Sequence, residues 1–281
     1  MTTKPTHQEM ILNSLDAMRR RNVLCDVTIT LTDGDVTAHR SVLAASCPYF
    51  AAMFTSGLCE MRQDTIRIAN IDASTFRLVL DFIYKGEVQL YYDNVQSAFV
   101  AASMLQLMGL VESCASFFTR CLDPTNCLGI RSLASVHSCP SLASSADSYA
   151  QENFNAVKNS DEFLELSSRD LIDLISRDSL NVRREEDVYD AVMRWVSVSD
   201  ERLDHLGSVL EHVRLPLVTW EFLRNRVGKN ALFTTREDCK TFLKVRMLYV
   251  CAPKQVSKSV LGKRPIGKRP VLFCRQFRFV D

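Results

Sequence analysis

The chain has 281 residues, of which 47% are hydrophobic and 24% are charged, and its formal net charge is +1. This length predicts two domains, and this composition excludes disorder over most of the chain. The near-neutral charge argues against nucleic-acid or membrane binding by the protein as a whole, although the last 28 residues hold eight Lys or Arg and one acid.

The first predicted element is a short amphipathic helix, which follows a flexible N-terminal segment, residues 1–9. Its apolar side chains recur at helical spacing, and polar residues fill the opposite face. These apolar residues are Ile11, Leu12, Leu15 and Met18. Because an apolar stripe is unfavourable in water, we expect it to pack against a partner surface.

A β-hairpin and a series of helices are predicted next. Apolar and polar residues alternate from Val27 to Leu31, and Asp33-Gly34 is a typical two-residue hairpin turn that leads into residues 36–38. Later patterns predict a helix over 41–45, a helix from Pro48 to Gly57 and a strand over 65–68. A helix capped by Ser74 and ended by Lys85-Gly86 follows. The last predicted elements are a strand over 88–90 and helical structure over 94–122, with a break near Met108-Gly109. Asp123-Pro124 stops the last helix, so the first domain is assigned to residues 10–123.

Residues 124–252 are assigned to an all-helical second domain, because strand patterns disappear after Asn126. Helices are predicted over 128–136, 142–157, 166–175, 188–198 and 203–213. Ser167 is a helix-start signal, as is Pro216 or Thr219, and the short connections favour stacked helical hairpins.

The final segment, residues 253–281, is predicted to be a flexible basic tail. Gly262-Lys263-Arg264-Pro265 recurs there as Gly267-Lys268-Arg269-Pro270, with too few apolar residues between to form a core. We interpret the repeat as solvated charge, with a nuclear address or a phosphate-binding patch as the alternatives.

No catalytic or metal-binding pattern is present in the sequence. It holds no G-x-S-x-G, Gly-rich phosphate loop or H-E-x-x-H motif, and its ten cysteines include no C-x-x-C pair. We therefore expect a protein that is not an enzyme and that has no cofactor and no metal. The polar N-terminus lacks the apolar core of a signal peptide and no apolar run is long enough to span a membrane, so we expect a soluble intracellular protein with reduced thiols.

Two pairs of residues allow both a structural and a functional interpretation. Asp26 and Arg40 flank the hairpin and would meet as partly buried opposite charges, either as a structural pair or as a charged pocket at a dimer interface. Leu58 and Glu60 lie just after Gly57 and, taken alone, are interpreted as loop residues.

The order of several motifs resembles the Kelch-like proteins. Leu24-Cys25-Asp26-Val27-Thr28, the stretch AHRSVLAA over 38–45, and Met53-Phe54-Thr55-Ser56-Gly57 resemble the BTB domain of that family. Leu180-Asn181-Val182 and Val213-Arg214-Leu215-Pro216-Leu217 are similar to its BACK domain. The resemblance covers about residues 9–252.

The resemblance implies a fold and a function. The fold is an α+β N-terminal BTB/POZ domain, with a short mixed sheet flanked by helices, followed by an all-α BACK domain of stacked helical hairpins. The function is that of an adaptor, cytoplasmic or also nuclear, which forms dimers with itself or with related BTB proteins and binds cullin-3 so that a bound substrate is ubiquitinated.

The same resemblance implies the site residues. The family's cullin-binding pattern is an apolar residue, any residue and then Glu, which stands here as Leu58-Cys59-Glu60. The expected cullin-binding residues are therefore Leu58 and Glu60, together with Phe54 at the start of the same segment. The expected dimer interface consists of Ile11, Leu12, Leu15, Met18, Asp26 and Arg40.

The chain departs from the family's pattern because it holds no Kelch blades, which are repeats of about 50 residues with Gly-Gly doublets. We therefore expect a fragment, a truncated isoform or a shortened gene model, which would act as a dominant-negative partner. The alternative functions are a BTB scaffold or transcriptional regulator that dimerises without binding cullin, and a thiol-based sensor. For the sensor, Cys121 after Arg120 and Cys274 beside Arg275 are the candidate thiols.

Overall fold

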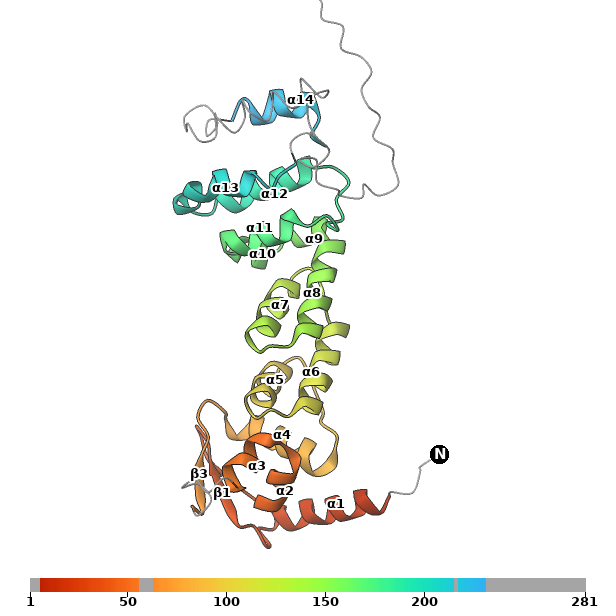
Figure 1. Ribbon diagram of the computed structural model, residues 1–281, viewed down its shortest axis with the longest axis vertical. Coiled ribbons are helices and arrows are strands. Elements are labelled where there is room, and N and C mark those ends of the chain that lie inside the picture. Colours follow the sequence, from red (N-terminus) through yellow and green to blue (C-terminus); the bar gives the residue numbers. More distant parts are fainter. Residues whose placement is uncertain (1–5, 56–62, 215–216, 231–281) are drawn as a thin grey trace, which may run out of the picture. The chain divides into compact units, whose positions relative to one another are not determined.

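The computed structural model describes residues 6–55, 63–214 and 217–230 of the chain (Figure 1). These residues form two compact units. The first unit comprises the described residues up to Cys121 together with Ala134–Leu142, and the second comprises Leu122–Leu133 and the described residues from Ala143 onward. Strands occur in the first unit, whereas the regular elements described in the second are helical, so the predicted α+β and all-helical organisation is confirmed.

The first unit combines a small sheet with helices that precede, separate and follow its strands. Its elements are α1 (His7–Arg20), β1 (Val27–Thr30), β2 (Asp35–Ala38), α2 (Arg40–Ser46), α3 (Pro48–Thr55), β3 (Thr65–Arg67), α4 (Ala73–Lys85), α5 (Val95–Met104) and α6 (Met108–Arg120). Helix α1 begins at His7 because Thr6 and Glu9 form a capping box. Residues 7–9, predicted to be flexible, therefore belong to the helix.

The sheet is mixed, as predicted, with strand order β2-β1-β3. Strand β1 pairs antiparallel with β2 and parallel with β3, so that Ile29 lies between Val36 and Ile66. These three side chains are buried, because alternate residues of a strand point to the same face and this face lies on the core. The alternation read from the sequence thus identified the buried face.

The hairpin turn lies one residue earlier than the Asp33-Gly34 signal predicts. The Leu31 N–H donates to the Gly34 carbonyl at 2.9 Å, so Thr32 and Asp33 occupy the tip. Contacts with the start of α4 explain the shift, because the Asp33 carboxylate accepts the Ala73 N–H at 2.6 Å. The prediction that Gly34 sits at the tip was therefore wrong.

Helix α4 ends where the sequence predicts but begins at a different cap. Gly86 adopts a left-handed conformation, with φ of 74°, and its N–H donates to the Phe82 carbonyl. At the other end, Asp72 rather than Ser74 is the N-cap residue, because its carboxylate accepts the Thr75 N–H at 2.7 Å and the Ser74 hydroxyl at 2.5 Å. The hydrogen bonds from Ser74 and from the Thr75 N–H lower the pKa of Asp72 to about 2.

Replacing Asp72 by Ala is expected to reduce the free energy of unfolding by about 1 kcal/mol at pH 7, the usual contribution of such a cap. Since the pKa is lowered in the folded state, this stabilisation is complete above the ordinary value of 3.8 and is lost as the pH falls towards 2. Urea denaturation at pH 7 and at pH 3 measures both effects. Ser74→Ala, which removes one of the donors to the Asp72 carboxylate, is the comparison, and a larger loss for Ser74→Ala than for Asp72→Ala would restore Ser74 as the cap.

The strand predicted over 88–90 does not form. The Asn94 side chain holds this stretch in an irregular conformation, because its Oδ1 accepts the Tyr91 N–H at 2.8 Å and its Nδ2 donates to the Gln89 carbonyl at 3.2 Å. The helical break predicted near Met108-Gly109 lies slightly earlier, at Leu105–Leu107, where Gln106 has a φ of 58°.

The second unit consists of short helices joined by short connections. Helix α7 (Cys127–Val136) begins in it, and the later elements in chain order are α8 (Pro140–Glu152), α9 (Phe154–Val157), α10 (Asp161–Glu165), α11 (Ser168–Ser176), α12 (Glu186–Val196), a 3₁₀ helix (Asp200–His205), α13 (Leu206–Leu210), α14 (Trp220–Phe222) and a π-helical turn (Leu223–Val227).

Most predicted helices of the second domain are present, with local differences. The predicted start at Ser167 is confirmed, because its hydroxyl accepts the Asp170 N–H at 3.1 Å. The helix predicted over 142–157 is interrupted at Asn153, and the one over 203–213 is partly a 3₁₀ helix. Helix α10, capped by Ser160, was not predicted because five residues are too few to show a helical period.

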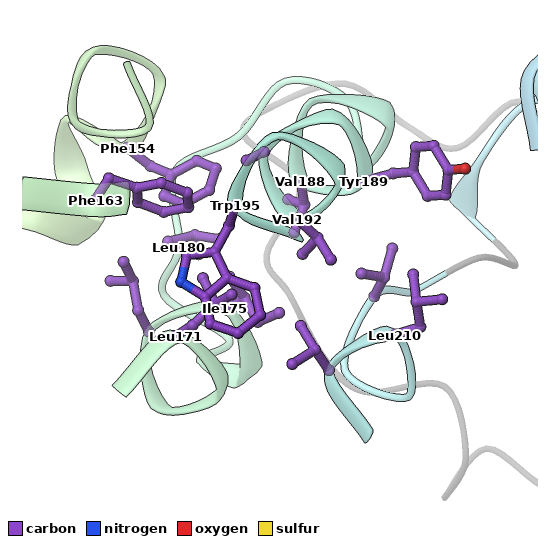
Figure 2. Packing of buried hydrophobic residues seen from close by; sticks show 14 of the residues in the cluster. Phe154, Phe163, Leu171, Ile175, Leu180, Val188, Tyr189, Val192, Trp195 and Leu210 are labelled. Carbon is purple, nitrogen blue, oxygen red and sulfur yellow. The ribbon is translucent and has the colours of Figure 1, made fainter. Parts of the chain in front are cut away.

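The core of the second unit is built around Trp195 on α12 (Figure 2). Its indole Nε1–H donates to the Leu166 carbonyl at 2.8 Å, and the Arg202 guanidinium lies 4.5 Å from its ring centroid. Figure 2 also labels other side chains of this core, which are Phe154, Phe163, Leu171, Ile175, Leu180, Val188, Tyr189, Val192 and Leu210. Apart from Leu180, which lies between α11 and α12, these residues come from helices α9 to α13, so one core holds the successive helices together.

The start of α7 is fixed by a carboxylate from α10. Glu162 accepts the N–H groups of Leu128 at 3.1 Å and Gly129 at 3.0 Å, and burial raises its pKa. A Cβ atom at residue 129 would lie 2.4 Å from the Glu162 Oε1 atom. A side chain at this position would therefore displace the Glu162 carboxylate from its present place.

Candidate interaction surfaces

Helix α1 is attached to α4 through charged side chains. The Asp16 side chain is buried and accepts hydrogen bonds from Arg19 at 2.7 Å and from Arg20 at 2.9 Å. Burial alone would raise the pKa of Asp16, but the hydrogen bonds and charges of the two arginines outweigh it and lower that pKa below its ordinary value. On α4, Asp81 pairs with Lys85 at 2.6 Å and with Arg20 at 3.4 Å.

The apolar stripe of α1 is left incompletely covered by the first unit. Ile11 is 48% exposed, and Leu12, Leu15 and Met18 are half-buried. Met10, which the sequence pattern did not single out, is 55% exposed. The structure thus brings all four predicted α1 residues onto one helix, which is attached to α4 by charged side chains and which retains exposed apolar surface.

The turn after α1 adds further exposed apolar surface. Val23 is 44% and Leu24 is 75% exposed. Leu24 has a φ of 57°, a left-handed conformation that is unusual for a residue with a branched side chain. No periodicity marks these two residues, because they lie outside the predicted helix and strand.

Asp26 and Arg40 meet, and each of two hydrogen bonds between them joins a side-chain group of one residue to a main-chain group of the other. The Asp26 carboxylate accepts the backbone N–H of Arg40 at 2.7 Å, and the Arg40 Nε–H donates to the Asp26 carbonyl at 3.0 Å. The Asp26 side chain is exposed and that of Arg40 is half-buried. The pair therefore fixes the start of α2 against the start of β1.

The expected cullin-binding residues are only partly described. Phe54 lies on α3, where it is buried and stacks on Phe50 with 5.9 Å between ring centroids. The Arg40 guanidinium carbon is 5.1 Å from the Phe54 ring centroid, and an Arg40 terminal nitrogen donates to the Gln63 carbonyl. Leu58 and Glu60 lie outside the described residues.

His39 is a buried polar residue whose role the sequence did not suggest. Its Nε2–H donates to the Val23 carbonyl at 3.1 Å, which leaves Nδ1 to accept the hydroxyl proton of Tyr84 at 2.8 Å. The His39 backbone N–H donates to the same hydroxyl oxygen, and burial raises the pKa of Tyr84. This network joins the end of β2 to α4 and to the turn after α1.

The described residues contain no cluster that would hold a metal ion, and burial disfavours the thiolate of two of their cysteines. Nowhere among them do three or more His, Cys, Asp or Glu side chains group in a way that would hold a metal ion. Burial raises the pKa of Cys114 to about 12 and that of Cys127 to about 11, which disfavours their thiolates. Of the proposed sensor thiols, Cys121 is half-buried and Cys274 lies outside the described residues. Each helix in the described part of the chain is too short or too polar to cross a bilayer.

Comparison with known proteins identifies both units. A BTB/POZ domain model matches residues 15–122, and a model described as BTB And C-terminal Kelch, or BACK, matches residues 127–228. Over 272 residues the chain is 40% identical to Kelch-like protein 3 of Rattus norvegicus, and it is 39% identical to Kelch-like protein 3 of Homo sapiens and of Bos taurus. The chain is a Kelch-like BTB–BACK protein. The alignments cover 96% of this chain and 46% of each relative, so the chain spans about half the length of the proteins that it matches.

The BTB and BACK matches are separated by Asp123–Asn126, the stretch in which the domain boundary was predicted. The Asp123 carboxylate accepts the Thr125 N–H at 2.6 Å, and the Asp123 N–H donates to the Asn126 side chain at 2.9 Å. The hydrogen bonds from Thr125 lower the pKa of Asp123. This turn lies between the end of α6 at Arg120 and the start of α7 at Cys127.

One stretch of the BACK match belongs to the compact unit that contains the BTB domain. In Ala134–Leu142, the ring of His137 lies edge-on to Phe99 of α5, with 5.7 Å between their centroids. The His137 carbonyl accepts the Ser103 hydroxyl at 3.4 Å. The sequence match and the packing of the chain therefore place this stretch in different domains.

Proposed function

We propose that the protein is a dimeric adaptor that binds cullin-3 in a cullin-RING ubiquitin ligase and so promotes ubiquitination of a bound substrate. The observation that carries the proposal is the alignment of 96% of the chain, through both the BTB and the BACK domains, with Kelch-like protein 3. Such an adaptor acts by proximity, because it raises the concentration of the substrate near the transferring enzyme. The proposal places it in the cytoplasm, with partners that include related BTB proteins.

The proposed dimer contact is the apolar stripe of α1. An isologous contact across a two-fold axis would cover Ile11, Leu12, Leu15 and Met18 with the same residues of a second copy. The attachment of α1 to α4 through Asp16 supports this, because it holds the helix in place before any partner arrives. In this proposal Asp26 and Arg40 lie near the same interface.

The proposed cullin contact is formed by Leu58 and Glu60, with Phe54 at the preceding end of helix α3. Leu58-Cys59-Glu60 supplies an apolar residue and a carboxylate at the spacing that the Kelch-like resemblance implies. Because the Phe54 side chain is buried, its contribution is to fix the end of α3 rather than to offer a large contact area.

Replacing Glu60 by Ala is expected to weaken binding of the N-terminal region of cullin-3 by about tenfold or more, the usual effect of losing a hydrogen bond to a charged group. Titration calorimetry measures the affinity, and sedimentation velocity checks that the dimer is retained. Glu201→Ala, at an exposed glutamate of the second unit, is the matched control. If the wild-type protein forms a dimer but does not bind cullin-3, the scaffold or regulator alternative replaces this proposal. If Glu60→Ala binds cullin-3 with the affinity of the wild type, only the assignment of Glu60 to the contact is rejected.

A further inference from the structure

Lysine is rare in the BTB and BACK domains of this chain. Between Lys4 and Lys229 the sequence holds two lysines, Lys85 and Lys158, although eighteen arginines lie in the same interval. The two cations differ in chemistry, because an arginine guanidinium always stays protonated, whereas a lysine amine can lose its proton and act as a nucleophile. The described residues therefore offer three side-chain amines to an acylating reagent, those of Lys85, Lys158 and Lys229.

Two of these amines are engaged in ion pairs. The Lys85 Nζ lies 2.6 Å from the Asp81 carboxylate and 4.0 Å from that of Asp16, and 35% of the Lys85 side chain is exposed. The Lys158 Nζ donates to the Asp187 carboxylate at 3.1 Å, and 17% of the Lys158 side chain is exposed. Each amine has to leave its carboxylate before it can reach an incoming carbonyl carbon, so both are hindered as nucleophiles.

Lys229 differs from both of these lysines. It is exposed, and no carboxylate in the described part of the chain pairs with it. The backbone on either side of it is hydrogen-bonded. The Gly228 N–H donates to the Leu223 carbonyl at 2.8 Å, and the Asn230 N–H donates to the Val227 carbonyl at 3.2 Å. Because Leu223 and Val227 are buried in the core of the second unit, these bonds hold Lys229 at the surface of that unit.

We propose that Lys229 is the residue of the described BTB and BACK domains to which the assembled ligase attaches ubiquitin on the adaptor itself. The inference rests on the proposed function and adds a form of regulation to it. In the transfer, the neutral Lys229 amine attacks the carbonyl carbon of the thioester that joins ubiquitin to a cysteine of the transferring enzyme. A C–N bond forms and the C–S bond breaks. The sulfur leaves with the electron pair, and the nitrogen releases a proton to solvent.

Access and pairing set the expected order of modification. An amine of the adaptor meets the thioester within one complex, so its effective concentration is high for all three lysines. Ion pairing at a surface is expected to slow acylation by up to about fivefold, and burial of most of the Lys158 side chain slows that amine further. The expected order is therefore Lys229, then Lys85, then Lys158.

The test combines the full chain with cullin-3, a RING subunit and a ubiquitin-charged conjugating enzyme. Mass spectrometry then quantifies the Gly-Gly remnant that trypsin leaves on each modified lysine. We expect the initial rate at Lys229 to be about threefold or more that at Lys85, and about tenfold that at Lys158. A reaction without cullin-3 is the control, and Lys229→Arg is expected to bind cullin-3 with the affinity of the wild type.

A second measurement tests the ion pairs without the ligase. Brief treatment of the free protein with the N-hydroxysuccinimide ester of acetic acid acylates lysine amines according to their access and pairing. Asp187→Asn removes the partner of Lys158, so it is expected to speed acylation of Lys158 by up to about fivefold and to leave Lys229 unchanged. A Lys158 that does not respond to this substitution would contradict the protection on which the inference depends.

Three results would overturn the inference while leaving the proposed function intact. The first is a wild-type protein that binds cullin-3 but acquires no remnant at Lys229. The second is modification of Lys85 or Lys158 at the rate of Lys229 or faster. The third is modification of Lys229 at the same rate when cullin-3 is left out. A wild-type protein that does not bind cullin-3 in calorimetry would overturn the inference and the proposed function together.

Discussion

Replacing Leu15 by Asp is expected to convert the dimer into monomers at micromolar concentration. In the proposed interface the new carboxylate would lie in an apolar contact without a partner charge, which is among the most unfavourable changes that one substitution can make. We expect the dissociation constant to rise more than a hundredfold, or roughly 3 kcal/mol. Leu15 is half-buried within its own unit, so the effect on folding is expected to be smaller than the effect on association.

Sedimentation velocity over a concentration series measures this change, and thermal melting followed by circular dichroism verifies that the variant folds. Asn13→Asp is the matched control, because it adds the same charge to an exposed position of the same helix. Two residues along a helix correspond to about 200° of rotation, which places Asn13 away from Leu15. A folded Leu15→Asp variant that remains dimeric would exclude α1 from the interface.

The largest loss of stability is expected from Trp195→Ala, at about 3 to 5 kcal/mol. The substitution opens a cavity in the centre of the second unit, since Trp195 is 1% exposed. It also removes the hydrogen bond to the Leu166 carbonyl and the contact with the Arg202 guanidinium, so that a partly buried acceptor and a cation both lose a partner.

Urea denaturation followed by far-ultraviolet circular dichroism measures the loss for the second unit. The chain supplies its own control, because Trp220, the other of its two tryptophans, is 40% exposed. We expect Trp220→Ala to change the free energy of unfolding by less than about 1 kcal/mol, as is usual for exposed side chains. Similar losses for the two variants would contradict the central place of Trp195 in the core.

The elements were predicted best where one local signal determines them. The alternation from Val27 gave the buried face of β1, Gly86 ended α4, and Ser167 began α11, because each signal acts on a neighbouring stretch of backbone. The turn after β1 was misplaced because Asp33 caps Ala73, which is 40 residues away in the sequence. Contacts over such separations leave no pattern in a single sequence.

In the candidate sites, too, features with a local sequence signal were predicted and contacts between distant segments were not. The stripe on α1 has a helical period and was recognised from spacing alone, although Val23 and Leu24 in the following turn were missed. The contacts of Arg40 with Phe54 and Gln63 could not be predicted, since they join three segments that no periodicity relates. Leu58 and Glu60 carry no physical signal of their own, and only resemblance to the Kelch-like family suggests their role.

The packing of Ala134–Leu142 against α5 determines how the chain can be divided. A fragment cut at Asp123–Pro124 would contain the complete BTB match but would lack His137, the ring that covers Phe99 in the first unit. Without residues 134–142, apolar surface at Phe99 would be exposed to solvent, which favours aggregation. A fragment that folds independently therefore has to extend about twenty residues beyond residue 122, where the BTB match ends.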